Sequence, residues 1–151
     1  MNGKIERCLQ NKNTICLDTA PIIYFIEENQ SFLSPLKEIF LRIDEGGLRA
    51  IASYITLIEV LVHPIEKGAH QLAKAYRDLL IGSPGFNLYP VERKVSEKAA
   101  ELRAKYKSFL KIPDAIQIAT AISFGAQIFI TNDADLKRIQ EIEIVDLTDL
   151  Q

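Results

Sequence analysis

Cysteine and histidine are scarce in this chain, which has two of each among 151 residues. Cys8 and Cys16 fit neither a metal-binding spacing nor a disulfide framework, and Cys16 falls in an apolar run typical of a buried strand. His63 and His70 are not spaced as a pair of metal ligands. These absences argue against a metal site built on sulfur or imidazole, and they favour a reducing, cytoplasmic setting.

An excess of positive charge and a long hydrophobic run are also missing. Lys and Arg number 18 against 20 Asp and Glu, so the net charge is −2 and any binding to nucleic acid must be local. The longest apolar stretch, residues 51–62, carries Ser53, Thr56 and Glu59 and is too short and too polar to span a bilayer. The first residues contain no apolar segment typical of a signal peptide.

No linker, repeat or low-complexity tract interrupts the sequence, and its length suits one domain with a sizeable core. Short apolar runs rich in β-branched residues alternate with segments of helical periodicity. The runs, which predict strands buried on both faces, are residues 14–17, 48–53, 86–91, 127–131 and 142–147. Helices are predicted over residues 21–28, 35–44, 56–62, 65–81, 92–110 and 113–124.

The alternation of strands and helices predicts an α/β fold, a three-layer sandwich with a mainly parallel central sheet flanked by helices. We expect one domain over residues 1–151. Residues 1–13 would form an N-terminal extension, which could contain a short helix through Ile5, Cys8 and Leu9.

Four carboxylates stand in apolar surroundings, where an uncompensated charge is costly to bury. They are Asp18 and Asp133, which follow predicted strands, Glu59, which lies within a predicted helix, and Asp114, which begins another helix after Pro113. In parallel sheets, ligands bind beyond the carboxyl ends of the strands. Four acids there, without matching bases, predict a site for a hard divalent cation, Mg²⁺ or Mn²⁺, because every ligand would be oxygen.

Asp18 and Glu59 also have purely structural interpretations. Asp18 could cap the helix that begins near Pro21. Thr56 and Glu59 have the spacing of a capping box, in which the two side chains satisfy the free amides at a helix start. For Asp18, capping and a role in a site are compatible, because a cap position also places a carboxylate at a strand end.

The later acids can be interpreted in the same way. Asp114 after Pro113 is favoured at a helix start, and Asp133 is typical of a turn. Asp135 could be a fifth metal ligand or could cap a helix over residues 136–140. Two carboxylates about 5 Å apart repel by roughly 3 kcal/mol at an effective dielectric of 20. Four acids at one edge of a sheet therefore favour a bound cation over four separate caps.

The segments around these acids resemble the signatures of the PIN-domain family. They are LDT at residues 17–19, TLIEV at 56–60, PDAIQIATA at 113–121 and ITND at 130–133, and they occur in the family's order. The resemblance extends from Thr14 over nearly the whole remaining chain, and within the family it points to the VapC-type toxins of bacterial toxin–antitoxin pairs. Such proteins are small metal-dependent endoribonucleases with a parallel sheet flanked by helices. The extension at residues 1–13 is longer than the family's usual lead-in.

Carried over by position, the resemblance implies catalytic and metal-binding roles for Asp18, Glu59, Asp114 and Asp133. It implies supporting roles for Thr56, Thr131 and Asn132. We expect Asp18 and Asp114 to contact the metal most directly, while Glu59 and Asp133 complete its shell partly through water. The partners to expect are an RNA substrate, a cognate antitoxin protein and a second copy of the chain in a homodimer.

Three basic residues precede Asp114 and are candidates for contacts with RNA phosphates. Arg103, Lys107 and Lys111 repeat every four residues, so they would share one helix face if the helix continued that far. The alternative is a solvated helix with a basic C-terminal end.

Rival enzyme classes lack required residues. A haloacid-dehalogenase-like phosphatase would place a second Asp two residues after Asp18, where this chain has Ala20. A receiver domain would need an acceptor Asp at the third strand, but residues 86–91 end without one. A dinucleotide-binding domain would need a Gly-rich turn after the first strand, which residues 19–21 exclude. A catalytically silent PIN-like module that binds RNA or protein is the alternative, although such a module has no need of four repelling carboxylates.

Overall fold

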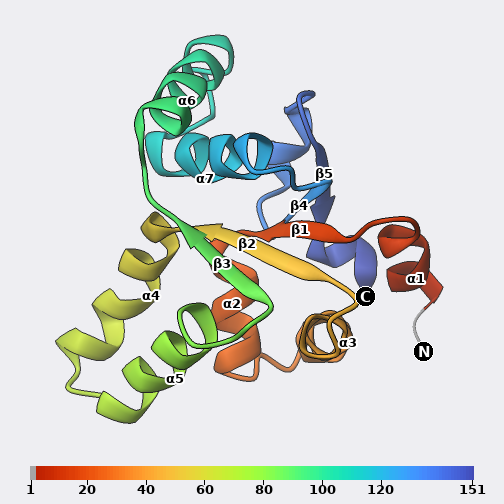
Figure 1. The fold of residues 1–151 in the computed structure, drawn as a ribbon, viewed down its shortest axis with the longest axis vertical. Helices are drawn as coiled ribbons and strands as arrows, with labels where there is room; N and C mark the ends of the chain where they lie inside the picture. Colours follow the sequence, from red (N-terminus) through yellow and green to blue (C-terminus); the bar gives the residue numbers. More distant parts are fainter. Residues whose placement is uncertain (1–2) are drawn as a thin grey trace.

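The structure is a computed structural model that describes residues 3–151, and it is built on a five-stranded sheet (Figure 1). All neighbouring strands are parallel, in the order β3-β2-β1-β4-β5. The strands are β1 (Thr14–Leu17), β2 (Arg49–Ser53), β3 (Phe86–Tyr89), β4 (Ile128–Thr131) and β5 (Glu143–Asp146). Each lies within two residues of its predicted bounds, because a short apolar run between helices has few other ways to bury both faces.

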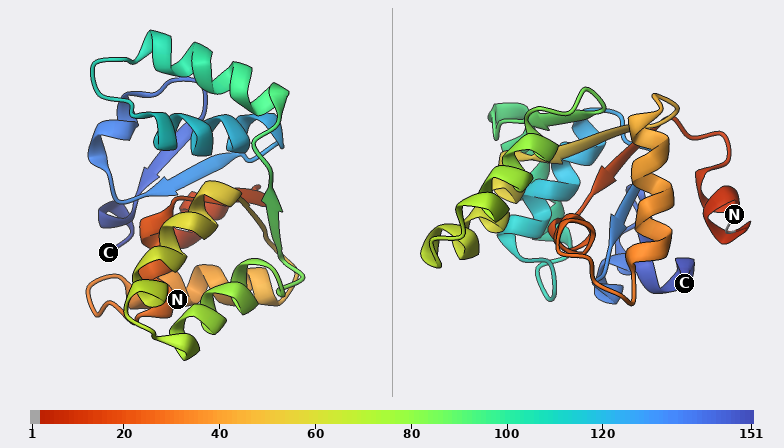
Figure 2. Two further views of the ribbon diagram at one scale, coloured as in Figure 1. Left: turned by 90° about the vertical axis from the view of Figure 1, so that its left-hand side faces the viewer. Right: turned by 90° about the horizontal axis from the view of Figure 1, so that it is seen from below.

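Helices cover both faces of the sheet and give the predicted three layers (Figure 2). They are α1 (Gly3–Leu9), α2 (Thr19–Ile26), α3 (Leu33–Asp44), α4 (Tyr54–Glu66), α5 (His70–Leu80), α6 (Arg93–Lys105) and α7 (Ile112–Ser123), with the 3-10 turns η1 (Ala134–Arg138) and η2 (Leu147–Leu150). The predicted extension begins at Met1, but residues 1 and 2 lie outside the described residues.

Successive strand residues alternate between two hydrophobic cores. Ile15 and Leu17 pack with side chains from α1 to α5, whereas Cys16 packs with α6 and α7 on the other face. In β4, Ile128 and Ile130 likewise face the first core, and Phe129 faces the second. This alternation follows from the pleat of a strand, which points successive side chains to opposite faces.

The prediction that a helix ends before Pro64 is wrong. Helix α4 continues through Pro64 to Glu66, and the next helix starts at His70 rather than at residue 65. A proline near the end of a helix removes a single backbone hydrogen bond, and the buried ring of Pro64 regains packing. The break comes at Gly68, whose φ of +66° suits glycine.

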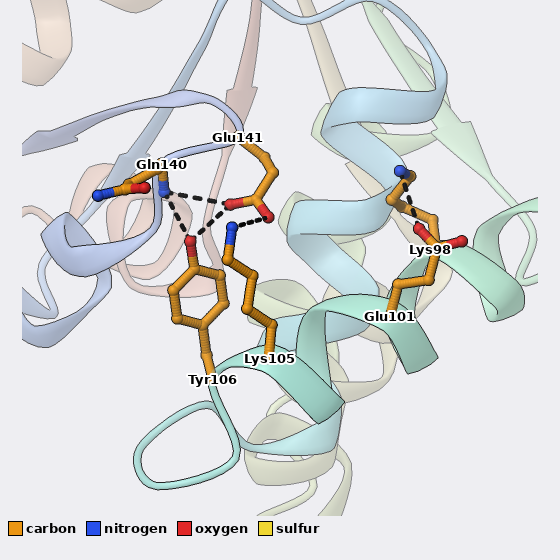
Figure 3. Close-up of polar contacts among 6 residues, drawn as sticks. All are labelled: Lys98, Glu101, Lys105, Tyr106, Gln140 and Glu141. Atoms are coloured by element: carbon orange, nitrogen blue, oxygen red, sulfur yellow. Dashed lines mark hydrogen bonds and ion pairs between the residues drawn. The ribbon is translucent and has the colours of Figure 1, made fainter.

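The predicted helix over residues 92–110 is also too long. Helix α6 ends at Lys105, because the Tyr106 hydroxyl donates to Glu141 Oε1 at 2.6 Å and accepts from the Gln140 amide at 3.1 Å (Figure 3). Lys105 joins the same contact through an ion pair of 3.1 Å to Glu141 (Figure 3). The chain then turns so that Leu110 becomes buried in the second core.

Because all five strands are parallel, their carboxyl ends lie at one edge of the sheet. The helices that follow β1 and β2 therefore start at that edge, and α7 packs against α4 and β2. Among residues 3–151, no helix is both long enough and apolar enough to cross a membrane.

Candidate active site

An acid follows each of two neighbouring strands, Asp18 after β1 and Asp133 after β4, and hydrogen bonds to one threonine connect them. Asp18 follows β1, and its amide donates to Ile130 O of β4 at 2.9 Å. The buried Thr131, which ends β4, donates its hydroxyl to Asp18 Oδ2 at 2.7 Å. The same hydroxyl accepts the Asp133 amide at 3.0 Å. Thr131 therefore holds the carboxylate of Asp18 and the backbone of Asp133 in one arrangement.

Asp18 is both a helix cap and a member of an acidic cluster. Its Oδ1 accepts the Thr19 amide at 2.8 Å, which caps α2, and the residue is only 9% exposed. Burial raises the pKa of Asp18, the hydrogen bonds from Thr131 and Thr19 lower it, and the charges of Glu59 and Asp133 raise it. Asp18 is thus a helix cap, and its carboxylate also lies within reach of the charges of Glu59 and Asp133.

The capping-box interpretation of Glu59 is wrong. Helix α4 starts at Tyr54 rather than near Thr56, and its cap is Ser53, whose Oγ accepts the Ile55 amide at 3.1 Å. Glu59 lies in the second turn and therefore has no free amide at the helix start to satisfy.

Glu59 is instead bound by side chains from two other helices. Its Oε1 accepts the Thr19 hydroxyl of α2 at 2.8 Å and the Gln117 amide of α7 at 2.6 Å. Gln117 Nε2 also donates to Thr19 Oγ1 at 3.1 Å, and Thr56 Oγ1 lies 3.3 Å from the same hydroxyl. This network joins α2, α4 and α7 around one carboxylate.

Asp114 occupies the first turn of α7 and, among the described residues, has no hydrogen-bond or ion-pair partner. Its pKa is raised to about 6, first by burial and then by the charges of Asp18, Asp133 and Glu59, while Lys111 lowers it. The structure therefore brings the four acids into electrostatic contact and leaves Asp114 as the one whose charge is least compensated.

The donor set fits a hydrated divalent cation better than a fully protein-bound one. Within residues 3–151, no three His, Cys, Asp or Glu side chains form a cluster that could hold a metal ion directly. The charged groups that could bind a cation are nevertheless all carboxylates, and Asp114 has no competing hydrogen-bond or ion-pair partner among the described residues. Mg²⁺ keeps several waters and is commonly bound through one or two carboxylates, so wider spacing between the remaining acids suits it.

Among the described residues, the side chains of Asp135 and Asn132 make no hydrogen bond to the carboxylates of Asp18, Glu59 or Asp114. Asp135 is exposed, and its amide donates to Asp133 Oδ1 at 3.0 Å, so Asp133 rather than Asp135 caps η1. Asn132 Nδ2 donates to the Tyr24 hydroxyl at 2.9 Å, which ties the end of β4 to α2.

The three basic residues do not share a helix face, because α6 ends at Lys105. Arg103 remains on the helix and donates from a guanidinium nitrogen to Lys107 O at 3.2 Å. Lys111 precedes α7 as its cap residue, and its charge acts on the pKa of Asp114.

Sequence reasoning missed Thr19 and Gln117 as members of the site. A signal for Gln117 was present, since it stands one turn after Asp114 and between two isoleucines in a mostly apolar helix. Thr19 offered no signal of its own beyond its place next to Asp18.

Comparisons with known proteins agree with this architecture. A family model described as "PIN domain" matches residues 15–142. A toxin–antitoxin complex from Klebsiella pneumoniae is similar in structure, with 26% identity, a TM-score of 0.66, and coverage of 88% of this chain and 97% of that chain. VapBC2 from Rickettsia felis, bound to a promoter DNA fragment, has 17% identity, a TM-score of 0.69, and coverage of 88% and 98%.

A third similar structure is VapC20 of Mycobacterium tuberculosis, described as a sarcin-ricin loop cleaving toxin. It has 17% identity, a TM-score of 0.67, and coverage of 85% of this chain and 98% of that chain. No curated protein matches the chain.

Proposed function

Because the chain belongs to the PIN-domain family, we propose that it is a metal-dependent endoribonuclease and the toxin of a toxin–antitoxin pair. The observation that carries this proposal is the convergence of three acids, Asp18, Asp133 and Glu59, on a fourth, Asp114, whose pKa they help to raise to about 6. The described activity of the M. tuberculosis neighbour and the complex from K. pneumoniae support the class of protein.

Asp18 and Asp114 would hold the cation most directly, and Glu59 and Asp133 would complete its shell partly through water. When bound, the cation neutralises charge at the scissile phosphate and activates a water. The protein side chains would keep the carboxylates in position for the cation. Thr131 orients Asp18 through its hydrogen bond, and within residues 3–151 Asp114 has no partner that would compete with the cation. We leave Asp135 outside the set, because its side chain is exposed and its hydrogen bond to Asp133 is made by the backbone amide.

RNA would reach the acids past three basic residues. A groove of about 540 Å³ between α6 and α7 is lined by Arg103 and Lys107 and extends to Ile112 and Ala115, which flank Asp114 in sequence. Lys111 directly precedes Ile112 as the cap residue of α7, and its charge lowers the pKa of Asp114. Its position supports a phosphate contact beside the acids, although the three residues do not form a single helix face.

An antitoxin would block the site most directly by placing an Arg or Lys among the carboxylates, where a charge-assisted hydrogen bond would replace the cation. Four exposed apolar side chains on one side of α4 offer a surface for a protein partner, and they are Tyr54, Ile58, Val62 and Ile65. A homodimer could use the same surface. We place the protein in the cytoplasm, where its RNA substrate and antitoxin would be found.

The test is cleavage of a panel of tRNA, rRNA and mRNA by the purified protein in Mg²⁺, in Mn²⁺ and in EDTA. We expect discrete cleavage products with either metal and none in EDTA. Undiminished cleavage in EDTA would overturn the metal dependence. RNA binding without cleavage in any metal would instead favour the silent PIN-like module.

A further inference from the structure

Gln117 is a buried polar side chain that the proposed chemistry does not require as a ligand. It is 1% exposed and stands on α7 one turn after Asp114. The residues on either side of it, Ile116 and Ile118, are apolar, so the packing of α7 alone does not call for an amide here.

The hydrogen bonds of Gln117 fix the orientation of its amide. Nε2 donates to Glu59 Oε1 at 2.6 Å and to Thr19 Oγ1 at 3.1 Å. The opposite orientation would turn the carbonyl oxygen of Gln117 toward a carboxylate, which is repulsive. Gln117 Oε1 consequently points away from Glu59 and has no hydrogen-bond partner among the described residues.

A buried carbonyl oxygen without a partner destabilises a fold. An apolar side chain of similar size at position 117 would avoid that cost. The amide therefore carries a cost that an apolar side chain would not, and what distinguishes it from such a side chain is its two donated hydrogen bonds. Both hydrogen bonds restrain the carboxylate of Glu59. The first is made to Glu59 Oε1 directly, and the second is made to the Thr19 hydroxyl, which itself donates to Glu59 Oε1.

We propose that Gln117 is a positioning residue that holds Glu59 Oε1 and thereby leaves Oε2 available to the cation or its waters. This inference rests on the proposed function. Glu59 is exposed on α4, so without this restraint its long side chain could adopt several rotamers. Helix α7 would then serve the site twice, since Asp114 would bind the cation and Gln117, one turn later, would orient a second carboxylate. Groups that orient ligands in this way commonly change metal affinity or activity by 10–100-fold.

The test variant is Gln117→Met, which removes the donor and the unpaired acceptor at similar volume. We expect Mn²⁺ to bind the metal-free protein about tenfold more weakly by calorimetry. The RNA cleavage rate should fall by a similar factor. The melting temperature in EDTA should stay the same or rise, because the unpaired carbonyl is gone. Thr120→Val is the matched control, since Thr120 is also buried on α7 but bonds Ile116 O instead of the site.

A double-mutant cycle with Glu59→Gln separates positioning from a general effect on the fold. If Gln117 acts through Glu59, Gln117→Met should cause no further loss of Mn²⁺ affinity in the Glu59→Gln background. Thr19→Val should weaken Mn²⁺ binding in the same direction, whereas Thr19→Ser, which keeps the hydroxyl, should restore it.

Wild-type affinity and rate in Gln117→Met would overturn the inference while leaving the proposed function intact. Equal losses in the presence and absence of Glu59 would also overturn it, as would a fall in melting temperature large enough to account for the lost activity. A wild-type protein that neither binds Mn²⁺ nor cleaves RNA would overturn the proposed function and this inference together.

Discussion

Asp18 and Asp146 stand at the ends of two strands of one parallel sheet and have nearly the same local chemistry. Asp18 is 9% exposed and accepts the Thr19 amide, and Asp146 is 4% exposed and accepts the Thr148 amide at 3.0 Å. Each caps the helical turn that follows its strand. Burial and capping therefore do not distinguish a residue of the acidic cluster from a structural one.

The difference lies in what the rest of the fold brings to each carboxylate. Asp18 follows the central strand β1, and the charges of Glu59 and Asp133 act on it. Asp146 ends the edge strand β5 and acts instead on a cation, Lys137, whose pKa is raised by its hydrogen bond to Asp149 and also by the charge of Asp146. The central position is where the strand order reverses, which is where α/β sheets bind ligands.

Asparagine substitutions should separate the two aspartates most strongly. Asp18→Asn and Asp114→Asn each remove a proposed metal contact, so RNA cleavage in Mg²⁺ should fall at least about a hundredfold. Asp146→Asn keeps a capping side chain outside the cluster and should change the rate by less than about twofold. Initial cleavage rates of the three variants at equal concentration measure this. A comparable loss in Asp146→Asn would mean that capping, rather than convergence of charge, controls activity.

Removing Asp114 should also stabilise the metal-free protein. Its pKa is raised from 3.8 to about 6 in the folded state, so the folded state holds a proton that the unfolded state has lost in that window. The contribution of Asp114 to the free energy of unfolding therefore falls as pH rises from about 4 to about 6, and it stays low above that. Asp114→Asn should be more stable than the wild type by about 1–2 kcal/mol at pH 7, after discounting for screening, and nearly equal to it below about pH 4.

Thermal unfolding in EDTA at several pH values tests this prediction, and added Mg²⁺ extends it. Saturating Mg²⁺ should raise the melting temperature of the wild type more than that of Asp114→Asn, because a ligand stabilises only as strongly as it binds. Asp146→Asn, whose charged neighbour is a lysine, should show no stabilisation in EDTA. If Asp114→Asn proved less stable in EDTA and both proteins responded equally to Mg²⁺, Asp114 would be a structural helix-start residue.

The features that could be predicted from the sequence are those that depend on residues close to one another along the chain. The five strands were recognisable as short apolar runs, and Asp18 and Asp114 stood out because Asp18 ends such a run and Asp114 opens an apolar helix. The end of α6 and the role of Gln117 were not predictable in this way. Tyr106 stops α6 by binding Glu141, 35 residues away, and Gln117 binds Glu59 and Thr19 over 58 and 98 residues. Contacts between residues so far apart in the sequence form only once the sheet has assembled, so the spacing of residues along the chain does not predict them.

Threonine substitutions sharpen the comparison at the level of hydrogen bonds. Thr131→Val keeps shape but leaves Asp18 Oδ2 and the Asp133 amide without the hydroxyl that now serves both. The free energy of unfolding should fall by about 1–3 kcal/mol, and the cleavage rate should fall about tenfold. Thr148→Val beside Asp146 is the control, because only the backbone amide of Thr148 bonds that carboxylate, and its exposed side chain should matter by less than about 0.5 kcal/mol.

Lysine substitutions should give the smallest effect, and they test whether the charge environment of each aspartate matters to RNA. Lys111 is exposed next to the cluster and partly offsets the raised pKa of Asp114, whereas Lys137 pairs with Asp149 near Asp146. Lys111→Met should raise the KM for RNA about two- to threefold and reduce the slope of log affinity against log salt by somewhat less than one unit, as expected for one lost phosphate contact. Lys137→Met should change neither quantity.

Titrations of labelled RNA at several salt concentrations measure the slope. Equal slopes for wild type and Lys111→Met would show that Lys111 only tunes Asp114, in which case the path of the RNA must follow other basic residues, such as Arg103 and Lys107 along the groove.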